Sequence, residues 1–293
     1  MNNMPIVVGV DGSDASLAAV RWATAQALRH GLRLCLVYAD NPPPSYGPVT
    51  ADPLAMDQHR RDTVNELVRA AAAEVPSEVP CETEIVSGPA VPVLRAASER
   101  AVLLVCGSSG LGAISGLLAG SVTVALAGHG TCPLVVVRGE PEQPDAPVAV
   151  GVDGSPASDA AIGLAFEQAA QRGGDLIAVH AWTDTVFPVG AYRDAYLAVD
   201  WELLDQQAHE LLTERLAGWA DKYPQVTVRR VVARDRPAHA LLDAAKGAGL
   251  IVVGSRGRGG FAGLLLGSVS QAMIHHAPCP VMIARPAAVR EPT

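Results

Sequence analysis

Long apolar runs are missing from this chain of 293 residues. Apolar runs such as Val102–Cys106 and Leu250–Val253 fall far short of the roughly 20 residues that cross a bilayer. The first residues also lack a basic segment followed by an apolar one, so we expect no secretory signal. Hydrophobic residues make up 49% of the chain and charged residues 18%, as in globular proteins. We therefore expect a cytoplasmic protein with no membrane partner.

Positive charge is scarce. The chain has 22 Lys and Arg against 30 Asp and Glu, a formal net charge of −8. Binding to nucleic acid through phosphate neutralisation needs a surplus of basic surface, so no nucleic-acid partner is expected. The two lysines, Lys222 and Lys246, do not follow a glycine-rich G-x-x-x-x-G stretch, which excludes a P-loop NTPase.

Metal and nucleophile motifs are also absent. The five cysteines contain no C-x-x-C pair, and no H-E-x-x-H or G-x-S-x-G segment occurs, so we predict no metal-ligating residues and no hydrolase triad. We interpret the cysteines as reduced, buried, small hydrophobic residues: Cys35, Cys81, Cys106, Cys132 and Cys279.

The chain is built from two copies of one unit. The segment Val8–Ser13 recurs as Val150–Ser155, and the glycine pattern that begins at Gly107 recurs from Gly254. A proline-rich, apolar-poor stretch separates the copies. We predict a first domain over residues 1–140, a linker over 141–147 and a second domain over 148–293.

Short β-branched runs alternate with alanine-rich stretches of helical period in each copy, which is typical of βα units around a parallel sheet. The fold class predicted is α/β, with two tandem open doubly wound (Rossmann-like) domains, each a mainly parallel five-stranded sheet with helices on both faces. Ser13 or Asp14 in the first copy, and Ser155 in the second, are expected to cap the first helices. The expected strands are 6–10, 32–39, 82–87, 102–106 and 134–137, then 148–152, 176–181, 227–233, 250–253 and 281–284.

Ligands of such sheets bind beyond the carboxyl ends of the strands, where the strand order reverses. This rule selects the loop after the first strand, with Asp11 or Asp153, and the glycine-rich loop after the fourth. Glycines there, followed by a helix N-terminus, suit phosphate binding. The alternatives are that the glycines only form tight turns and that each Asp only forms an Asx-turn or a helix cap. Ser121 and Ser268 are expected to act as N-caps as well.

Two motifs together resemble the universal stress protein family along nearly the whole chain. One is Val-Gly-Val-Asp-Gly-Ser at the end of the first strand, and the other is G-x-x-G, nine residues, then G-[ST]; both occur in both copies. The dinucleotide fingerprint G-x-G-x-x-G fails, because Gly116 comes one residue too late after Gly110 and Gly112.

The resemblance implies that each copy binds ATP, with Mg²⁺ held mainly by phosphate oxygens. It places Asp11 and Asp153 on the ribose and adenine side, Ala39 and Ala181 at the adenine, and the glycine motif at the ribose and phosphates. The motif residues are Gly107, Gly110, Gly120, Ser121 and Val122 in the first copy, and Gly254, Gly257, Gly267, Ser268 and Val269 in the second.

The copies differ in charge. The second glycine loop contains Arg256 and Arg258, which suit phosphate, whereas Gly107–Ala113 contains no arginine. We therefore hypothesise that the second site binds ATP at least as tightly as the first. In the second copy, the long segment after the second strand contains five aromatic residues and includes the five-residue expansion of this copy. The aromatic residues form either a satellite hydrophobic cluster or a lid or partner surface: Trp182, Phe187, Tyr192, Tyr196 and Trp201.

The function that the resemblance implies is a nucleotide-dependent stress and growth regulator, acting on a protein partner that the sequence does not identify. Catalytic residues are not predicted, because no general base stands beside the glycine loops. A slow ATPase or nucleotidyl-type enzyme, and an interaction module with vestigial sites, stay open as alternatives. The apolar final strands are expected to lie at sheet edges, to pair the two copies and to form a homodimer.

Overall fold

The computed structural model describes residues 4–42, 53–110, 120–139, 145–183, 200–258 and 265–285. The chain divides into two units, Met1–Arg138 and Gly139–Thr293. Each unit holds one copy of the sequence repeat. The segments expected as linker and as expanded aromatic loop fall partly outside the described residues: 141–144 and 184–199.

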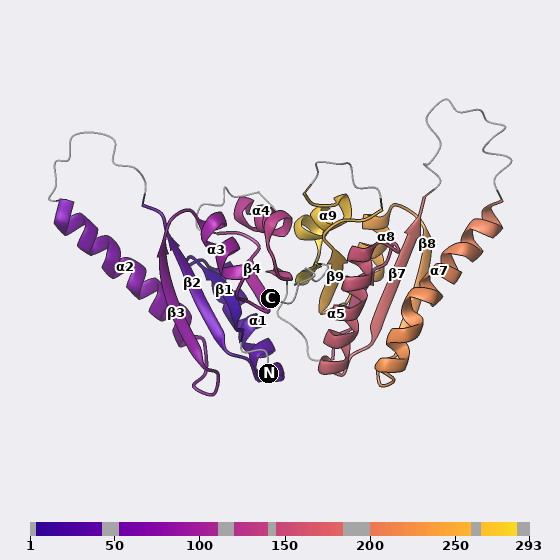
Figure 1. Cartoon of the computed structure of the whole chain (residues 1–293), viewed down its shortest axis with the longest axis horizontal. Helices are drawn as coiled ribbons and strands as arrows, with labels where there is room; N and C mark the ends of the chain where they lie inside the picture. The colour runs from indigo at the N-terminus through magenta and orange to yellow at the C-terminus, as the bar shows by residue number, and fades with distance from the viewer. Residues whose placement is uncertain are drawn as a thin grey trace, which may run out of the picture. The chain divides into compact units, whose positions relative to one another are not determined.

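The first unit is a parallel sheet of five strands in the order β3-β2-β1-β4-β5 (Figure 1). The chain runs outward from β1 to β3 and then returns past β1 to β4 and β5, so right-handed crossovers place α1 and α2 on one face and α3 and α4 on the other. The elements are β1 (Ile6–Val10), α1 (Asp14–His30), β2 (Leu34–Asp40), α2 (Pro53–Ala73), β3 (Cys81–Ser87), α3 (Ala90–Ser98), β4 (Leu103–Gly107), α4 (Ser121–His129) and β5 (Leu134–Val137).

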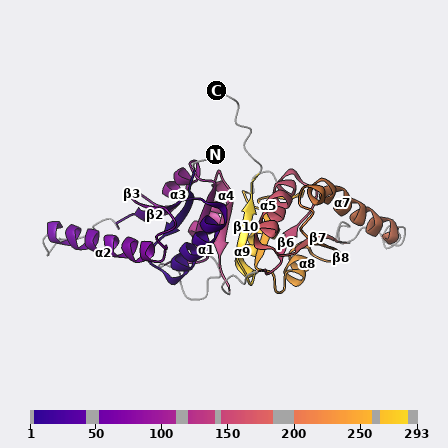
Figure 2. The ribbon, with the colours of Figure 1, turned by 90° about the horizontal axis from the view of Figure 1, so that it is seen from below.

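The second unit repeats this topology in the order β8-β7-β6-β9-β10, again all parallel. Figure 2 shows its helices α5 and α8 on the two sides of β6. The elements are β6 (Val148–Gly151), α5 (Pro156–Arg172), β7 (Leu176–Trp182), α7 (Trp201–Lys222), β8 (Val228–Arg234), α8 (Pro237–Ala244), β9 (Leu250–Gly254), α9 (Ser268–His276) and β10 (Val281–Ala284).

The predicted fold class is confirmed: the chain forms two tandem doubly wound α/β domains. All ten expected strands are present, with ends that differ from the prediction by at most two residues because strand ends are set by hydrogen bonding rather than by composition. The central strands β1 and β6 are buried on both faces, with Val7, Val8 and Val150 at 0% exposure, whereas the edge strands β3 and β8 are partly exposed along their length. The continuous apolar runs reflect this two-sided burial.

The first helix of each unit is fixed by a serine cap, as predicted. The Ser13 hydroxyl oxygen accepts a hydrogen bond from the backbone N–H of Ser16, and Ser155 accepts one from Ser158, both at 3.2 Å. Asp14 is instead the first residue of α1. These caps anchor the N-termini of α1 and α5 directly beside the carboxyl ends of the sheet.

The cysteine prediction needs one correction. None of the five cysteines forms a disulfide, and four are buried, but Cys81 is only half-buried. Cys81 opens β3, the edge strand of its sheet, so it has a neighbouring strand on one side only. Within the described ranges, the structure contains no helix that is long and apolar enough to span a membrane.

Candidate functional site

The turn after the first strand of the second unit is tied to the glycine loop by one carboxylate. Asp153 Oδ1 accepts a hydrogen bond from the backbone N–H of Ser155, and Asp153 Oδ2 accepts one from the backbone N–H of Arg258, both at 2.9 Å. Burial of Asp153 opposes its ionisation, but the bonds from Ser155 and Arg258 outweigh it and lower the pKa of the carboxyl. Asp153 therefore holds two loops together as an anion.

The first unit has the same turn. Asp11 Oδ1 accepts hydrogen bonds from the N–H and the hydroxyl of Ser13, at 3.0 and 2.6 Å. The predicted Asx-turn is thus present in both copies. A Cβ at Gly110 would overlap Asp11 Oδ2, and a Cβ at Gly257 would overlap the matching oxygen of Asp153. The second glycine of each G-x-x-G is explained by this carboxylate lying against it.

The first glycine of each motif permits a close approach between helix and strand. A Cβ at Gly254 would lie 2.8 Å from the carbonyl carbon and oxygen of Ala157 in α5, and one at Gly107 would lie 2.6 Å from the carbonyl carbon of Ala15 in α1. The last glycine is different. Among the described residues, and leaving out its chain neighbours, a Cβ at Gly267 would come no closer than 3.4 Å to any atom, and one at Gly120 no closer than 3.6 Å. Packing against the described part of the chain therefore does not account for Gly120 and Gly267.

The helices that follow these glycines begin without a side-chain cap. Ser121 and Ser268 were predicted as N-caps, which is wrong: they are the first helical residues, and Gly120 and Gly267 hold the extended N-cap conformation. Neither helix has a side-chain cap bond among the described residues. The N–H groups at the start of α4 and α9, which no described side chain caps, carry partial positive charge and suit an anion.

A cavity of about 720 Å³ opens beside the α9 start in the second unit, a volume typical of small-molecule sites. The residues that line it include all nine that the sequence assigned to this copy: Asp153, Ala181, Gly254, Arg256, Gly257, Arg258, Gly267, Ser268 and Val269. The seven first-copy residues occupy the equivalent ends of β1, β2 and β4 and the start of α4: Asp11, Ala39, Gly107, Gly110, Gly120, Ser121 and Val122.

The cavity has two chemically different ends. The α9 end has bare N–H groups and two arginines, and the guanidinium of Arg258 lies over the backbone of Gly154, where a Cβ would approach Arg258 Nη2 at 2.5 Å. The β7 end is formed by His180, Ala181 and Trp182, with Leu241 of α8 nearby. One end therefore suits an anion, and the other suits a flat, largely apolar group.

Sequence reasoning missed His180 and Trp182 as lining residues. Their position on either side of Ala181 was the available signal. His180 is 8% exposed, and its Nδ1 lies 2.7 Å from the carbonyl oxygen of Val152. The ring therefore joins the end of β7 to the residue that follows β6.

The two units differ at this end. In the second, the rings of Trp182 and Trp201 are stacked at 6.1 Å, with the Arg234 guanidinium 4.1 Å from the Trp201 ring centre. Of the predicted aromatic cluster, Phe187, Tyr192 and Tyr196 lie outside the described residues.

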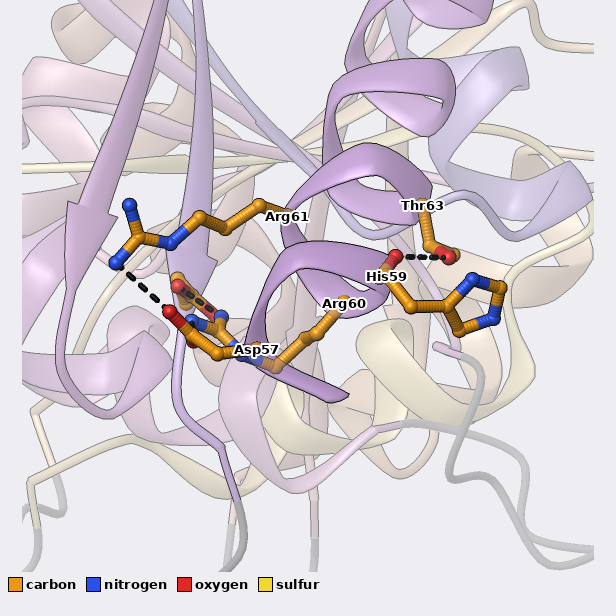
Figure 3. A network of polar contacts seen from close by, with 6 residues as sticks. Asp57, His59, Arg60, Arg61 and Thr63 are labelled. Atoms are coloured by element: carbon orange, nitrogen blue, oxygen red, sulfur yellow. Dashed lines mark hydrogen bonds and ion pairs between the residues drawn. The ribbon is translucent and has the colours of Figure 1, made fainter. Parts of the chain in front are cut away.

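In the first unit, the residue matching Trp182 is Asp40. Asp40 forms an ion pair with Arg60 of α2, and Arg60 also pairs with Asp57 at 2.7 Å. Figure 3 shows Asp57 between Arg60 and Arg61, with the Asp57–Arg61 pair at 2.8 Å and His59 turned to the other side of the helix. This network ties the start of α2 to the end of β2.

No cluster of three or more His, Cys, Asp or Glu suited to a metal ion occurs in the described part of the chain. At its α9 end the cavity offers backbone N–H groups and the guanidinium groups of Arg256 and Arg258, which bind anions. The carboxylate of Asp153 already accepts backbone hydrogen bonds with both oxygens, so a cation at this end would need ligands from the bound molecule itself.

Comparison with known proteins places both copies in one family. The profile of the Universal stress protein family matches residues 2–138 and 146–285. A universal stress protein of Mycobacterium tuberculosis strain H37Rv is 40% identical over 296 residues, covering 97% of each chain, and one of Mycobacterium bovis is 39% identical over 309 residues, covering 97% of this chain and 95% of the relative. The crystal structure of a universal stress protein from Archaeoglobus fulgidus has a TM-score of 0.67, 19% identity and 97% coverage of both chains. The chain belongs to the universal stress protein family, with one domain of that family in each unit.

Proposed function

We propose that the chain binds an adenine nucleotide, ATP in particular, in the cavity of the second unit and at the equivalent residues of the first. The observation that carries the proposal is the two-ended cavity. A nucleotide has an anionic phosphate end and a flat base end, and the α9 start and the β7 end offer the complementary surfaces.

Two further observations support this proposal. Packing explains the first two glycines of each motif but not Gly120 or Gly267, whose missing side chains leave space in front of an uncapped helix. Nine lining residues are those expected for the nucleotide. Mg²⁺, where present, would be held by phosphate oxygens, since the donor groups at the α9 end are cationic or N–H groups.

Binding rather than turnover is the proposed role. Both carboxylate oxygens of Asp153 accept backbone hydrogen bonds, so this acid is committed to holding the loops and is not placed as a general base. The nucleotide would then act as a signal, with occupancy of the site read by a protein partner during stress or growth arrest. Turnover of ATP alone above roughly 1 s⁻¹, the range of ordinary enzymes, would contradict this role.

The test is calorimetric titration of the full chain with ATP and Mg²⁺, together with mass spectrometry of small molecules released by heating the purified protein. We expect one nucleotide per copy, and binding much reduced in the Gly120→Ala/Gly267→Ala variant. A wild-type protein that neither releases nor takes up nucleotide would refute the proposal. Unchanged binding in the double variant would show that the nucleotide does not bind at these loops.

A homodimer formed through the final strands stays a prediction. β5 and β10 are the end strands in the order of their own five-stranded sheets, and both are apolar throughout. Sedimentation velocity over a wide range of protein concentration checks this, and a monomer at every concentration would contradict it.

A further inference from the structure

His180 is a buried residue that lines the cavity, and the roles of its two ring nitrogens can be deduced from its partner. Nδ1 lies 2.7 Å from the carbonyl oxygen of Val152. A carbonyl oxygen only accepts, so Nδ1 carries the proton of this bond, and in a neutral ring Nε2 then holds a lone pair and no proton. Nε2 makes no hydrogen bond to any residue that the structure describes. The ring, 8% exposed, lines the cavity as a hydrogen-bond acceptor.

His180 stands at the end of the cavity away from the anion-binding helix start. β7 neighbours β6, and β6 neighbours β9, whose loop leads to α9. Two strand spacings separate β7 from β9, about 10 Å. A nucleotide with its phosphates at α9 therefore has its base near His180.

We propose that Nε2 of His180 accepts a hydrogen bond from the 6-amino group of adenine, and that the second cavity thereby selects adenine over 6-oxo purine nucleotides. This inference rests on the proposed nucleotide site. A 6-oxo purine presents at this position an oxygen that only accepts, so two acceptors would face each other and neither would be paired. Sites built to hydrogen-bond a substrate group reject analogues that lack it.

The first unit lacks this selectivity. Tyr38, the fifth residue of β2, occupies the position of His180, the fifth residue of β7. Burial, together with the nearby charges of Asp40 and Asp11, raises the pKa of Tyr38, so its hydroxyl stays protonated. A hydroxyl can donate or accept and can therefore pair with either an amino or an oxo group. Discrimination between purines is thus a property of the second copy alone.

The experiment is an NMR titration of the full chain, with ATP and ITP as probes. ITP differs from ATP in carrying a 6-oxo group. The backbone amides of Gly267 and Ser268 report occupancy of the second cavity, and long-range proton–nitrogen spectra report the protonation of each histidine nitrogen. We expect Nδ1 to be protonated and Nε2 to be unprotonated, with the Nε2 signal shifted by ATP. We expect ATP to bind about tenfold more tightly than ITP, because ATP gains one hydrogen bond to Nε2 whereas ITP leaves Nε2 unpaired.

The matched variant is His180→Asn, whose amide can still donate to Val152 but has no counterpart of Nε2. It should bind ATP and ITP with nearly equal affinity. His239→Asn changes a histidine that does not line the cavity and should keep the preference for ATP.

The outcomes separate the two proposals. If neither nucleotide shifts the backbone amide signals of Gly267 and Ser268, the proposed function fails. If both bind equally well to the wild-type chain, if Nε2 carries a proton, or if His180→Asn keeps the preference, nucleotide binding stands and the role of His180 is overturned.

Discussion

The carboxylate of Asp153 accepts a hydrogen bond at 2.9 Å from the backbone N–H of Arg258, a residue 105 positions along the chain. The bond joins the turn after β6 to the glycine loop after β9, the two loops between which the cavity opens. The carboxylate of Asp153 thus helps to fix the glycine loop, alongside the backbone hydrogen bonds from Ser255 to Ala284 and from Gly267 to Ser255.

Replacing this carboxylate should alter stability in a pH-dependent way. The pKa of Asp153 is lowered in the fold, so its ionised form stabilises the protein above the unfolded pKa of about 3.9, and this contribution is lost as the pH falls through the lower folded value. Asp153→Asn should lower the free energy of unfolding by about 1 kcal/mol at pH 7. Urea denaturation at neutral and acidic pH should show this difference shrinking below about pH 4. A difference that grows with acid would contradict the assignment.

The glycines of the second motif should respond differently to alanine. Gly254→Ala forces a Cβ against the backbone of Ala157 and should cost about 1–3 kcal/mol of unfolding free energy. Gly267, with φ at −72° and its nearest atom at 3.4 Å, should accept alanine without loss of stability but with weaker ATP binding. Thermal unfolding and calorimetric titration measure the two effects.

Gly218 is the control for this series. It lies within α7 with open space around its Cα, so Gly218→Ala should raise stability through helix propensity and leave ATP binding unchanged. Loss of stability in Gly267→Ala equal to that in Gly254→Ala would show that the last glycine is structural after all.

The arginines should act on the phosphates. Arg258→Ala should weaken ATP binding about tenfold, because charged hydrogen bonds are worth about 1.5–3 kcal/mol, and should leave adenosine binding almost unchanged. Arg215→Ala is the control, since Arg215 pairs with Asp159 at 3.1 Å and does not line the cavity. Calorimetric titration at two salt concentrations measures the affinities of both variants for ATP and adenosine. No effect of Arg258→Ala, with the first copy binding more tightly, would contradict the hypothesis that the second site is at least as strong.

The thiols should differ in reactivity. Burial raises the pKa of Cys106 to about 12, and burial followed by the charge of Glu84 raises that of Cys35 to about 12. The pKa of Cys81 is also raised, by burial and then by Glu82, but this thiol is only half-buried. Iodoacetamide at pH 8 should therefore modify Cys81 well before Cys35 and Cys106, as peptide mass spectrometry can follow. Equal rates at all three would refute this order.

The sequence by itself determined the internal repeat, the doubly wound α/β fold class and the place of the candidate site at the carboxyl ends of the strands. These rest on local signals: the apolar period of each strand, the serine caps at Ser13 and Ser155, and glycines at fixed spacing after the fourth strand of each copy. Because parallel strands end at one edge of a sheet, a loop that follows a strand is placed by topology as soon as the strand is recognised. Asp153 and the glycine loop were predictable for this reason, whereas Ala181 was expected only from the resemblance to the universal stress protein family.

Only the tertiary structure decided which atoms face one another. That Asp153 binds the N–H of Arg258, that His180 turns Nδ1 toward Val152 and that Cys81 is half-exposed all depend on distances between residues far apart in sequence. Hydrogen bonding and burial change over a few tenths of an ångström, whereas residue spacing fixes only the element to which a side chain belongs.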